Sequence, residues 1–417
     1  MRKASIMFVV IIIALALAAG VMVAACGSSS SSSSTSSSSA APTGDIVVGH
    51  IVNLTGPEAM VGKGQQTALD TAFKTLGPIN GRTVKVITVD AKGTSADAVN
   101  AARQLVEQNH VVAIFGPTEI GQKMAVGNYL KTAGLPNLIY NPSPIQAFQG
   151  NKWIVGVGGG TAQQPSVMGD YLYNGVSAKT INTLTEDSSA GRAFVDPLTQ
   201  VFTQEGGKVL KQQWVPETAT DFSPYLTALP AADYLVAWEP GDAGIKLFIQ
   251  WYQLGISKKM PIAAAFHGGF TDGFIIAALP KPVSAAVVST GTLATQSYDP
   301  GSTSPENQQM QAALTPILGF PPSDDGFSGP WQAAVLFEAG VQKANGDTSP
   351  DALLTGLLGS SIVGPEGPTS FPSGQQFATR NVYVQKIIPV PGHAKSFTYQ
   401  TIKTYENVPP EGFTPGQ

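Results

Sequence analysis

The chain has 417 residues, of which 43% are hydrophobic and only 12% are charged, and its formal net charge is −4. This length is enough for two or three domains with substantial cores. The slightly acidic balance, with no polybasic run, argues against nucleic-acid binding. A single cysteine excludes an internal disulfide framework and a Cys-rich zinc site.

The first 25 residues have the layout of a secretory signal. Arg2 and Lys3 precede an apolar run over residues 6–19, and small residues then lead to Cys26. The segment from Val23 to Cys26 resembles a bacterial lipobox, in which the peptide is cut before the cysteine and the thiol is lipidated. The alternative is a transmembrane anchor, because residues 6–25 are just long enough to cross a bilayer. We expect a signal peptide over 1–25 and a lipid anchor at Cys26.

The segment that follows the cysteine is a run of serine that cannot bury a core. A flexible chain from Ser28 to Gly44 has a root-mean-square reach of roughly 20–25 Å. Residues 26–44 are therefore predicted to tether a folded body to the outer face of a bacterial cell membrane, or to its periplasmic side in a cell with two membranes.

From Asp45 onward, β-rich apolar runs alternate with helical patterns. In the first half, strands are expected at 46–52, 83–89, 111–115 and 138–140, with helices around 68–76, from a cap at Ser95 to Val106, and before Leu138. This βαβαβαβ order predicts a parallel sheet covered by helices on both faces.

The glycine-rich stretch Gly156–Gly160 interrupts the series, and a second set of elements follows. Strands are expected at 181–185, 208–215, 234–238, 262–266 and 285–289, with two antiparallel strands at 380–387 and 396–405. Helices are expected at 193–204, 244–254, 306–318, 330–344 and 350–358. Gly158, Gly159 and Gly160 lack the spacing of a dinucleotide-binding loop, so we interpret them as a hinge or crossover.

The order and spacing of several short motifs resemble the leucine/isoleucine/valine-binding protein family. These motifs are Leu54–Gly62, Asn80–Arg82, Phe115–Pro117, Glu186–Ser188 with Gly191–Arg192, and Ala219–Ser223. The family comprises type I periplasmic solute-binding proteins of ABC importers for branched-chain amino acids and amides. The resemblance covers about Asp45 to Ile388.

This resemblance implies an α/β fold of two Rossmann-like lobes with parallel sheets, joined by a three-crossover hinge. Lobe 1 is expected to contain residues 45–156 and 290–365, and lobe 2 residues 157–289 and 366–417. The implied partners are a small-molecule solute and an ABC permease with its ATPase subunits. A monomer without cofactor, metal or nucleic-acid partner is expected, and the implied mechanism is closure of the hinge on the solute.

The resemblance also places the solute contacts, and several departures from the family pattern stand among them. Glu119 and Ile120 occupy positions where amino-acid-binding members commonly have serines, and a carboxylate there would repel a carboxylate ligand. Val61 and Ala190 replace tyrosines, and His267 falls near the acidic residue that meets the ligand's ammonium. The expected contacts are Met60, Val61, Thr118, Glu119, Ile120, Tyr140, Asn141, Ser143, Ala190, Trp238, Glu239 and His267.

We interpret these departures as a roomier pocket that is less specific for zwitterions, in which the solute is an amino-acid-like, amide or more apolar or aromatic compound. The alternative is that hydroxyls such as Thr118 and Ser143 do the work of the missing serines. A ligand sensor coupled to a receptor remains open beside transport, because both use the same closure. An enzyme is not expected, since no Gly-x-Ser-x-Gly elbow and no paired acid–histidine motif occurs.

Overall fold

The computed structural model describes residues 43–416 except 57 and 393–395. The predicted signal peptide, Cys26 and most of the Ser-rich tether lie outside the described residues. The described residues all belong to one compact unit. Within the described ranges, no helix combines the length and the hydropathy needed to cross a membrane.

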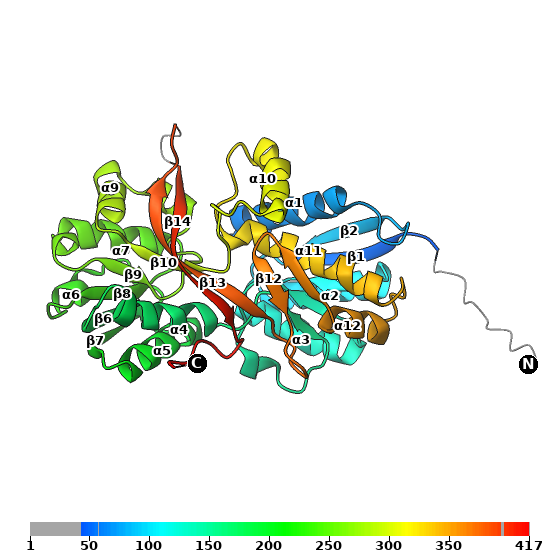
Figure 1. Cartoon of the computed structure of the whole chain (residues 1–417), viewed down its shortest axis with the longest axis horizontal. Coiled ribbons are helices and arrows are strands. Elements are labelled where there is room, and N and C mark those ends of the chain that lie inside the picture. Colours follow the sequence, from blue (N-terminus) through cyan, green and yellow to red (C-terminus); the bar gives the residue numbers. More distant parts are fainter. Residues whose placement is uncertain (1–42, 57, 393–395, 417) are drawn as a thin grey trace, which may run out of the picture. The chain divides into compact units, whose positions relative to one another are not determined.

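The first half of the unit forms a five-stranded parallel sheet in the order β2-β1-β3-β4-β5. Figure 1 shows helices packed along it. The strands are β1 (Ile46–Val52), β2 (Val84–Asp90), β3 (Ile114–Phe115), β4 (Asn137–Ile139) and β5 (Ile154–Gly156), and the helices are α1 (Ala59–Leu76), α2 (Ser95–Arg103), α3 (Ile120–Ala133) and the short η1 (Gln104–Gln108) and η2 (Ile145–Phe148).

Two of the motifs that resemble the family contain a glycine that no larger residue could replace, because the backbone of another segment lies too close to it. A Cβ at Gly62 on α1 would lie 2.0 Å from the Asn53 carbonyl oxygen, and one at Gly116 would lie 2.5 Å from that of Ile51. Gly116 also has a φ of 78°, a conformation that favours glycine. Both glycines therefore let later segments pack directly on the end of β1.

The second sheet is nine-stranded, with the order β11-β12-β13-β10-β9-β8-β6-β7 and with β14 paired to β13. Its strands β7, β6, β8, β9 and β10 are parallel, whereas β10 meets β13 antiparallel. The strands are β6 (Thr180–Glu186), β7 (Lys208–Val215), β8 (Tyr234–Trp238), β9 (Ile262–Ala264), β10 (Leu293–Gln296), β11 (Ser361–Gly364), β12 (Gly367–Ser370), β13 (Thr379–Pro389) and β14 (Phe397–Val408).

Helices accompany both sheets. Those next to the second sheet are α4 (Gln163–Asp170), η3 (Tyr171–Gly175), α5 (Ser189–Gln204), α6 (Ser223–Thr227), α7 (Asp242–Gln253), η4 (Ile256–Lys258), α8 (Gly273–Ala278) and α9 (Lys281–Ser289). After β10 the chain returns to the first sheet as α10 (Pro305–Leu318), α11 (Asp325–Lys343) and α12 (Pro350–Leu358). Phe337 of α11 meets Phe73 and Phe115 edge to face, with ring centroids 5.8 and 5.6 Å apart.

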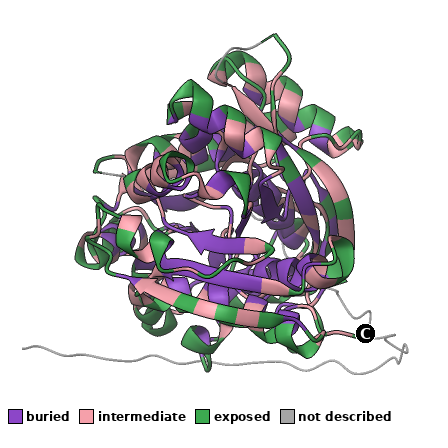
Figure 2. Ribbon diagram, turned by 90° about the vertical axis from the view of Figure 1, so that its left-hand side faces the viewer, coloured by how far each residue is buried: buried purple, intermediate pink, exposed green. Residues whose placement is uncertain are grey.

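Each sheet has its own hydrophobic core. The core around the second sheet includes Phe194 of α5 and Phe248 of α7, and the core around the first includes Phe115 and Trp331. Figure 2 shows buried strands in the interior, whereas exposed residues lie on the outer helix faces and on strands at the edge, such as β7. The predicted α/β architecture with parallel sheets is confirmed, whereas the exact lobe boundaries stay a prediction.

Three expected details are wrong. Residues 285–289 are not a strand but the end of α9, and the strand β10 comes after them. Pro282 stands in the first turn of α9 and two alanines follow, which favours a helix despite the two valines. The cap of α2 is Thr94 rather than Ser95, since the Thr94 hydroxyl accepts from the Asp97 amide. The predicted strand at 111–115 shortens to β3.

Candidate functional site

Each sheet has one point where the strand order reverses, and both points carry the predicted contacts. β1 lies between β2 and β3, and β6 lies between β7 and β8. In open α/β sheets, ligands bind beyond the carboxyl ends of the strands at such a point. In this chain the loops at these positions contain Thr118 after β3, Glu186 at the end of β6, and Glu239 after β8.

At the first switch point, buried polar groups hold Thr118 in place. The Thr118 hydroxyl donates to Gln65 Oε1 over 2.6 Å, and the Tyr140 hydroxyl donates to the same oxygen over 3.4 Å. His50 Nε2 lies 2.9 Å from the Tyr140 hydroxyl. Burial lowers the pKa of His50 to about 3 and raises that of Tyr140, so both side chains are neutral. The network positions Thr118 without placing a charge behind it.

A buried lysine orders the next loop. Lys123 on α3 is 1% exposed, and its Nζ donates to the carbonyl oxygens of Pro142 over 2.9 Å and Asn141 over 3.4 Å. Burial lowers its pKa to about 7, although Glu119 and Asp325 oppose this fall. These bonds hold the backbone of the loop that carries the predicted contacts Asn141 and Ser143.

Aromatic rings stand at the second switch point. Trp238 is 7% exposed, and its indole nitrogen donates to the Gly268 carbonyl oxygen over 2.8 Å. Phe194 of α5 meets Trp238 edge to face at 4.8 Å and stacks on Phe266 at 4.3 Å between centroids. The three rings therefore form one apolar wall beside the carboxyl ends of β8 and β9.

Two glutamates follow the same pair of strands. Thr185 and Trp238 are register partners in β6 and β8, so Glu186 and Glu239 are the next residues on neighbouring strands. Glu239 is 2% exposed, and its Oε1 is buried without a hydrogen-bond partner among the described residues. Burial and the nearby Glu186 carboxylate raise the pKa of Glu239 to about 8.

His267 is engaged by protein groups on both ring nitrogens. Its Nε2 lies 3.0 Å from Asp325 Oδ1 and 3.9 Å from Asp272 Oδ1, and its Nδ1 lies 3.2 Å from Gln164 Oε1. Burial opposes the charged ring, but Asp325, Asp272 and Asp324 outweigh it and raise the pKa of His267 to about 9. The imidazolium therefore links the loop after β9, in the second core, to the start of α11, in the first.

The other predicted contact residues lie near the same strand ends, and their side chains differ in how far they are exposed to solvent. Met60 is 67% exposed at the start of α1. Glu119 is exposed, Ser143 is buried, and the remaining ones, Val61, Ile120, Asn141 and Ala190, are half-buried. Their contact with a solute stays a prediction.

Carboxylates of the two halves approach one another. Burial raises the pKa of Glu58, and Glu119 and Asp272 add to that rise. Burial likewise raises the pKa of Glu186, and Glu217 and Glu119 add to it. Glu119 from the first half and Glu186 from the second are thus close enough to interact electrostatically, and the region is acidic.

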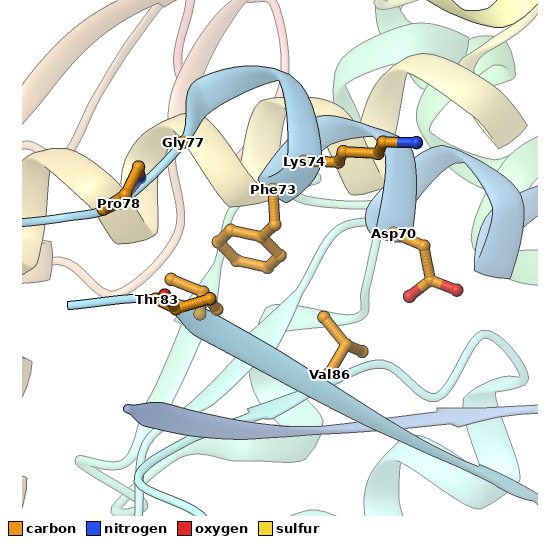
Figure 3. Close-up of a pocket in the computed structure, with 8 residues that line it drawn as sticks. Asp70, Phe73, Lys74, Gly77, Pro78, Thr83 and Val86 are labelled. Carbon is orange, nitrogen blue, oxygen red and sulfur yellow. The ribbon is translucent and has the colours of Figure 1, made fainter. Parts of the chain in front are cut away.

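A separate hollow of about 500 Å³ lies between the end of α1 and β2. Figure 3 shows Phe73 and Val86 facing each other across it, with Asp70 and Lys74 on the helix above. It lies away from both switch points, and its charged groups do not converge, so we do not take it as the functional site.

Sequence reasoning missed Lys123, Gln164 and Asp325. A lysine or an aspartate on a helix ordinarily faces water, and nothing in the local pattern distinguishes these from surface residues. Their importance comes from contacts with residues 18 to 161 positions away along the chain. In the described part of the chain, no group of three His, Cys, Asp or Glu side chains could hold a metal ion.

A family model described as periplasmic binding protein matches residues 45–392. Among curated proteins, the chain is 27% identical over 209 residues to Leu/Ile/Val-binding protein homolog 3 of Brucella melitensis, an overlap of 48% of this chain and 56% of the relative. An amino acid binding protein of Pseudomonas aeruginosa is 23% identical over 201 residues. The chain thus spans about half the length of the curated relatives it matches.

Solved structures show the same fold over nearly their whole length. A solute binding protein of an ABC transporter from Rhodopseudomonas palustris BisB5, in complex with 3,4-dihydroxybenzoic acid, has a TM-score of 0.76 at 21% identity, covering 87% of this chain and 98% of that chain. A leucine binding protein from Thermotoga maritima has a TM-score of 0.73 at 19% identity, covering 87% and 99%.

Proposed function

The chain belongs to the periplasmic binding protein family, and we propose that it is the extracytoplasmic solute-binding component of an ABC importer. The observation that carries this proposal is the placement of polar and aromatic side chains at the switch point of each of two parallel sheets. Transport is favoured over receptor-coupled sensing because relatives of the same fold are described as ABC transporter proteins. The partners would be a permease and its ATPase subunits.

The proposed mechanism is capture of a small organic solute between the two switch points. From the first half, residues 60–61, 118–120 and 140–143 would contact the solute. From the second half, Ala190, Trp238, Glu239 and the loop that contains His267 would do so. A solute that touches both halves stabilises the closed form over the open one, because only the closed form offers all its contacts at once.

We propose that Gly158–Gly160 is one of the three crossover segments of the hinge. This segment follows β5 of the first sheet and precedes α4, which packs on the second core. A Cβ at Gly160 would lie 2.0 Å from the Pro410 carbonyl oxygen, so a larger residue would displace the C-terminal segment. Lobe 1 would comprise residues 45–156 and 290–365, and lobe 2 residues 157–289 and 366–417.

We further propose that the protein is exported and held at the outer face of the membrane by lipid on Cys26, with residues 26–44 as the tether. The supporting observation is the sequence alone, in which small residues precede the single cysteine and a serine run follows it. At least two acyl chains are needed for stable anchoring, and lipidated N-terminal cysteines of this type carry at least two.

The function is tested by identifying the solute. The full-length protein is purified from its host, and small molecules released on denaturation are identified by mass spectrometry and then titrated back by calorimetry. We expect an organic solute that binds with one-to-one stoichiometry and whose uptake is lost when the gene is deleted. Unaltered uptake of a solute that binds would refute the transport role, and failure to bind any solute would refute the binding role.

A further inference from the structure

The electrostatics of the proposed site differ from those expected for a carboxylate ligand. Glu119 stands at the start of α3, where the helix amides would otherwise attract an anion. Glu58 occupies the position before α1 without a side-chain capping bond, and Glu119 is close enough to raise its pKa. The Glu119 carboxylate also raises the pKa of Glu186, which belongs to the other half of the chain. Four glutamates, including Glu239, therefore stand at the two switch points.

Glu239 is the member whose position points to a ligand. It is 2% exposed, and its Oε1 is buried without a hydrogen-bond partner in the described part of the chain. Thr185, at the end of the neighbouring strand, also has a buried hydroxyl without a partner there. A buried carboxyl oxygen without a partner is costly, and a donor group on the solute would remove that cost at Glu239.

Three cations on the loops and helices of the proposed site are engaged by other groups. Arg192 pairs with Asp187 and lies over the Trp214 ring at 4.1 Å. Lys123 donates to two backbone carbonyls, and His267 pairs with Asp325. Burial and Glu186 account for the raised pKa of Glu239, and no cation opposes them. Among the described residues, no positive charge is thus identified that acts on Glu239.

We propose that the solute is an organic cation, an amine without a carboxylate, whose ammonium group donates to Glu239. The proposal rests on the solute-binding function proposed above. The aromatic wall of Trp238, Phe194 and Phe266 would take the apolar body of the amine, and the faces of such rings also attract cations. A carboxylate on the same solute would meet the field of Glu58, Glu119 and Glu186.

The groups that face Glu239 determine how binding depends on pH. Glu186 on the neighbouring strand keeps Glu239 protonated near neutrality, and Glu186 in turn faces Glu119, Glu217 and the Ser188 hydroxyl. An incoming ammonium favours the ionised carboxylate, so a proton must leave when the amine binds below pH 8. Affinity for an amine therefore rises between pH 6 and pH 9, whereas affinity for an anion does not.

The test is calorimetric titration of the full-length protein with solutes matched in skeleton but not in charge. One set is 2-phenylethylamine, phenylalanine and 3-phenylpropionate, and further sets use aliphatic skeletons. We expect the amine of a set to bind best, and at least tenfold tighter at pH 9 than at pH 6. Glu239→Gln should weaken amine binding at least tenfold at pH 9. Glu205→Gln, at the far end of α5, makes the same charge change and should alter it less than twofold.

The outcomes separate the two proposals. Preference for the carboxylate or the zwitterion of a set, or unchanged amine binding by Glu239→Gln, overturns the cation assignment and leaves solute binding intact. Failure of every set to bind overturns the cation assignment, whereas the binding role is refuted only if the solute search by mass spectrometry also finds nothing that binds. Circular dichroism of each variant shows whether the fold is retained. Glu186→Gln provides a second variant: it removes the carboxylate that keeps Glu239 protonated, so the difference in amine affinity between pH 6 and pH 9 should shrink, and an unchanged pH dependence would overturn the cation assignment.

Discussion

Replacing His267 by glutamine should destabilise the protein in a strongly pH-dependent way. The imidazolium is 1% exposed and pairs with Asp325 at 3.0 Å, with Asp272 at 3.9 Å. Removing one partner of a buried ion pair leaves an uncompensated charge, which costs about 3–5 kcal/mol. Because His267 belongs to a loop of the second core and Asp325 to a helix of the first, the pair also joins the two cores.

The pKa gives the pH window of this effect. The carboxylates raise the pKa of His267 from its ordinary 6.5 to about 9, which corresponds to about 3 kcal/mol. A raised histidine pKa means that the folded protein binds the proton more tightly than the unfolded chain. The stabilisation is therefore complete below pH 6.5 and is lost as the pH rises through 9.

The assay is urea unfolding of wild type and His267→Gln at pH 6.5 and pH 10, followed by circular dichroism. The difference in free energy of unfolding between the two proteins should shrink by about 3 kcal/mol across this range. His110→Gln, which changes an exposed histidine, is the matched control and should show no such trend. A difference that stays constant with pH, or that is below about 1 kcal/mol at pH 6.5, would refute the reasoning.

The other predictions concern the solute and the anchor. Trp238→Ala should weaken solute binding at least tenfold in calorimetry while circular dichroism stays unchanged, and equal affinity would remove Trp238 from the site. Lys123→Met removes the donor to two loop carbonyls, and loss of the equivalent of one such bond, about 1.5 kcal/mol, would lower affinity about tenfold; an unchanged dissociation constant would contradict this. Cys26→Ala should move the protein from the membrane fraction to the soluble fraction without altering solute affinity, and membrane retention of the variant would contradict the lipid anchor.

Much of the fold could be predicted because its signals are local. Strands such as β1 and β8 are apolar runs closed by turn residues, and the βα alternation then implies a parallel sheet. The strand predicted at 285–289 is wrong because the two adjacent valines favour a strand locally, whereas Pro282 and the alanines start a helix of nine residues, which is too short to show a clear period. The two short strands β11 and β12 were missed because four-residue strands with a glycine at one end give almost no periodicity.

The site was harder to predict than the fold because its chemistry depends on distant contacts. The sequence places Glu239 and His267 at strand ends, where functional residues are expected. It does not indicate that Asp325 pairs with His267, or that nothing in the described residues pairs with Glu239. Both facts come from how α11 and the loops pack, which no local pattern encodes.

The difference in pairing between His267 and Glu239 determines which charged groups the site can bind. In the family that the sequence resembles, the position near His267 carries the acid that meets a ligand's ammonium. Here that position holds a cation, and Asp325 and Asp272 balance it. The acid whose buried Oε1 has no partner among the described residues lies instead at Glu239, one strand away, next to Trp238. If a charged solute group binds at this edge of the second sheet, it must therefore be a cation, and it must approach β8 rather than β9.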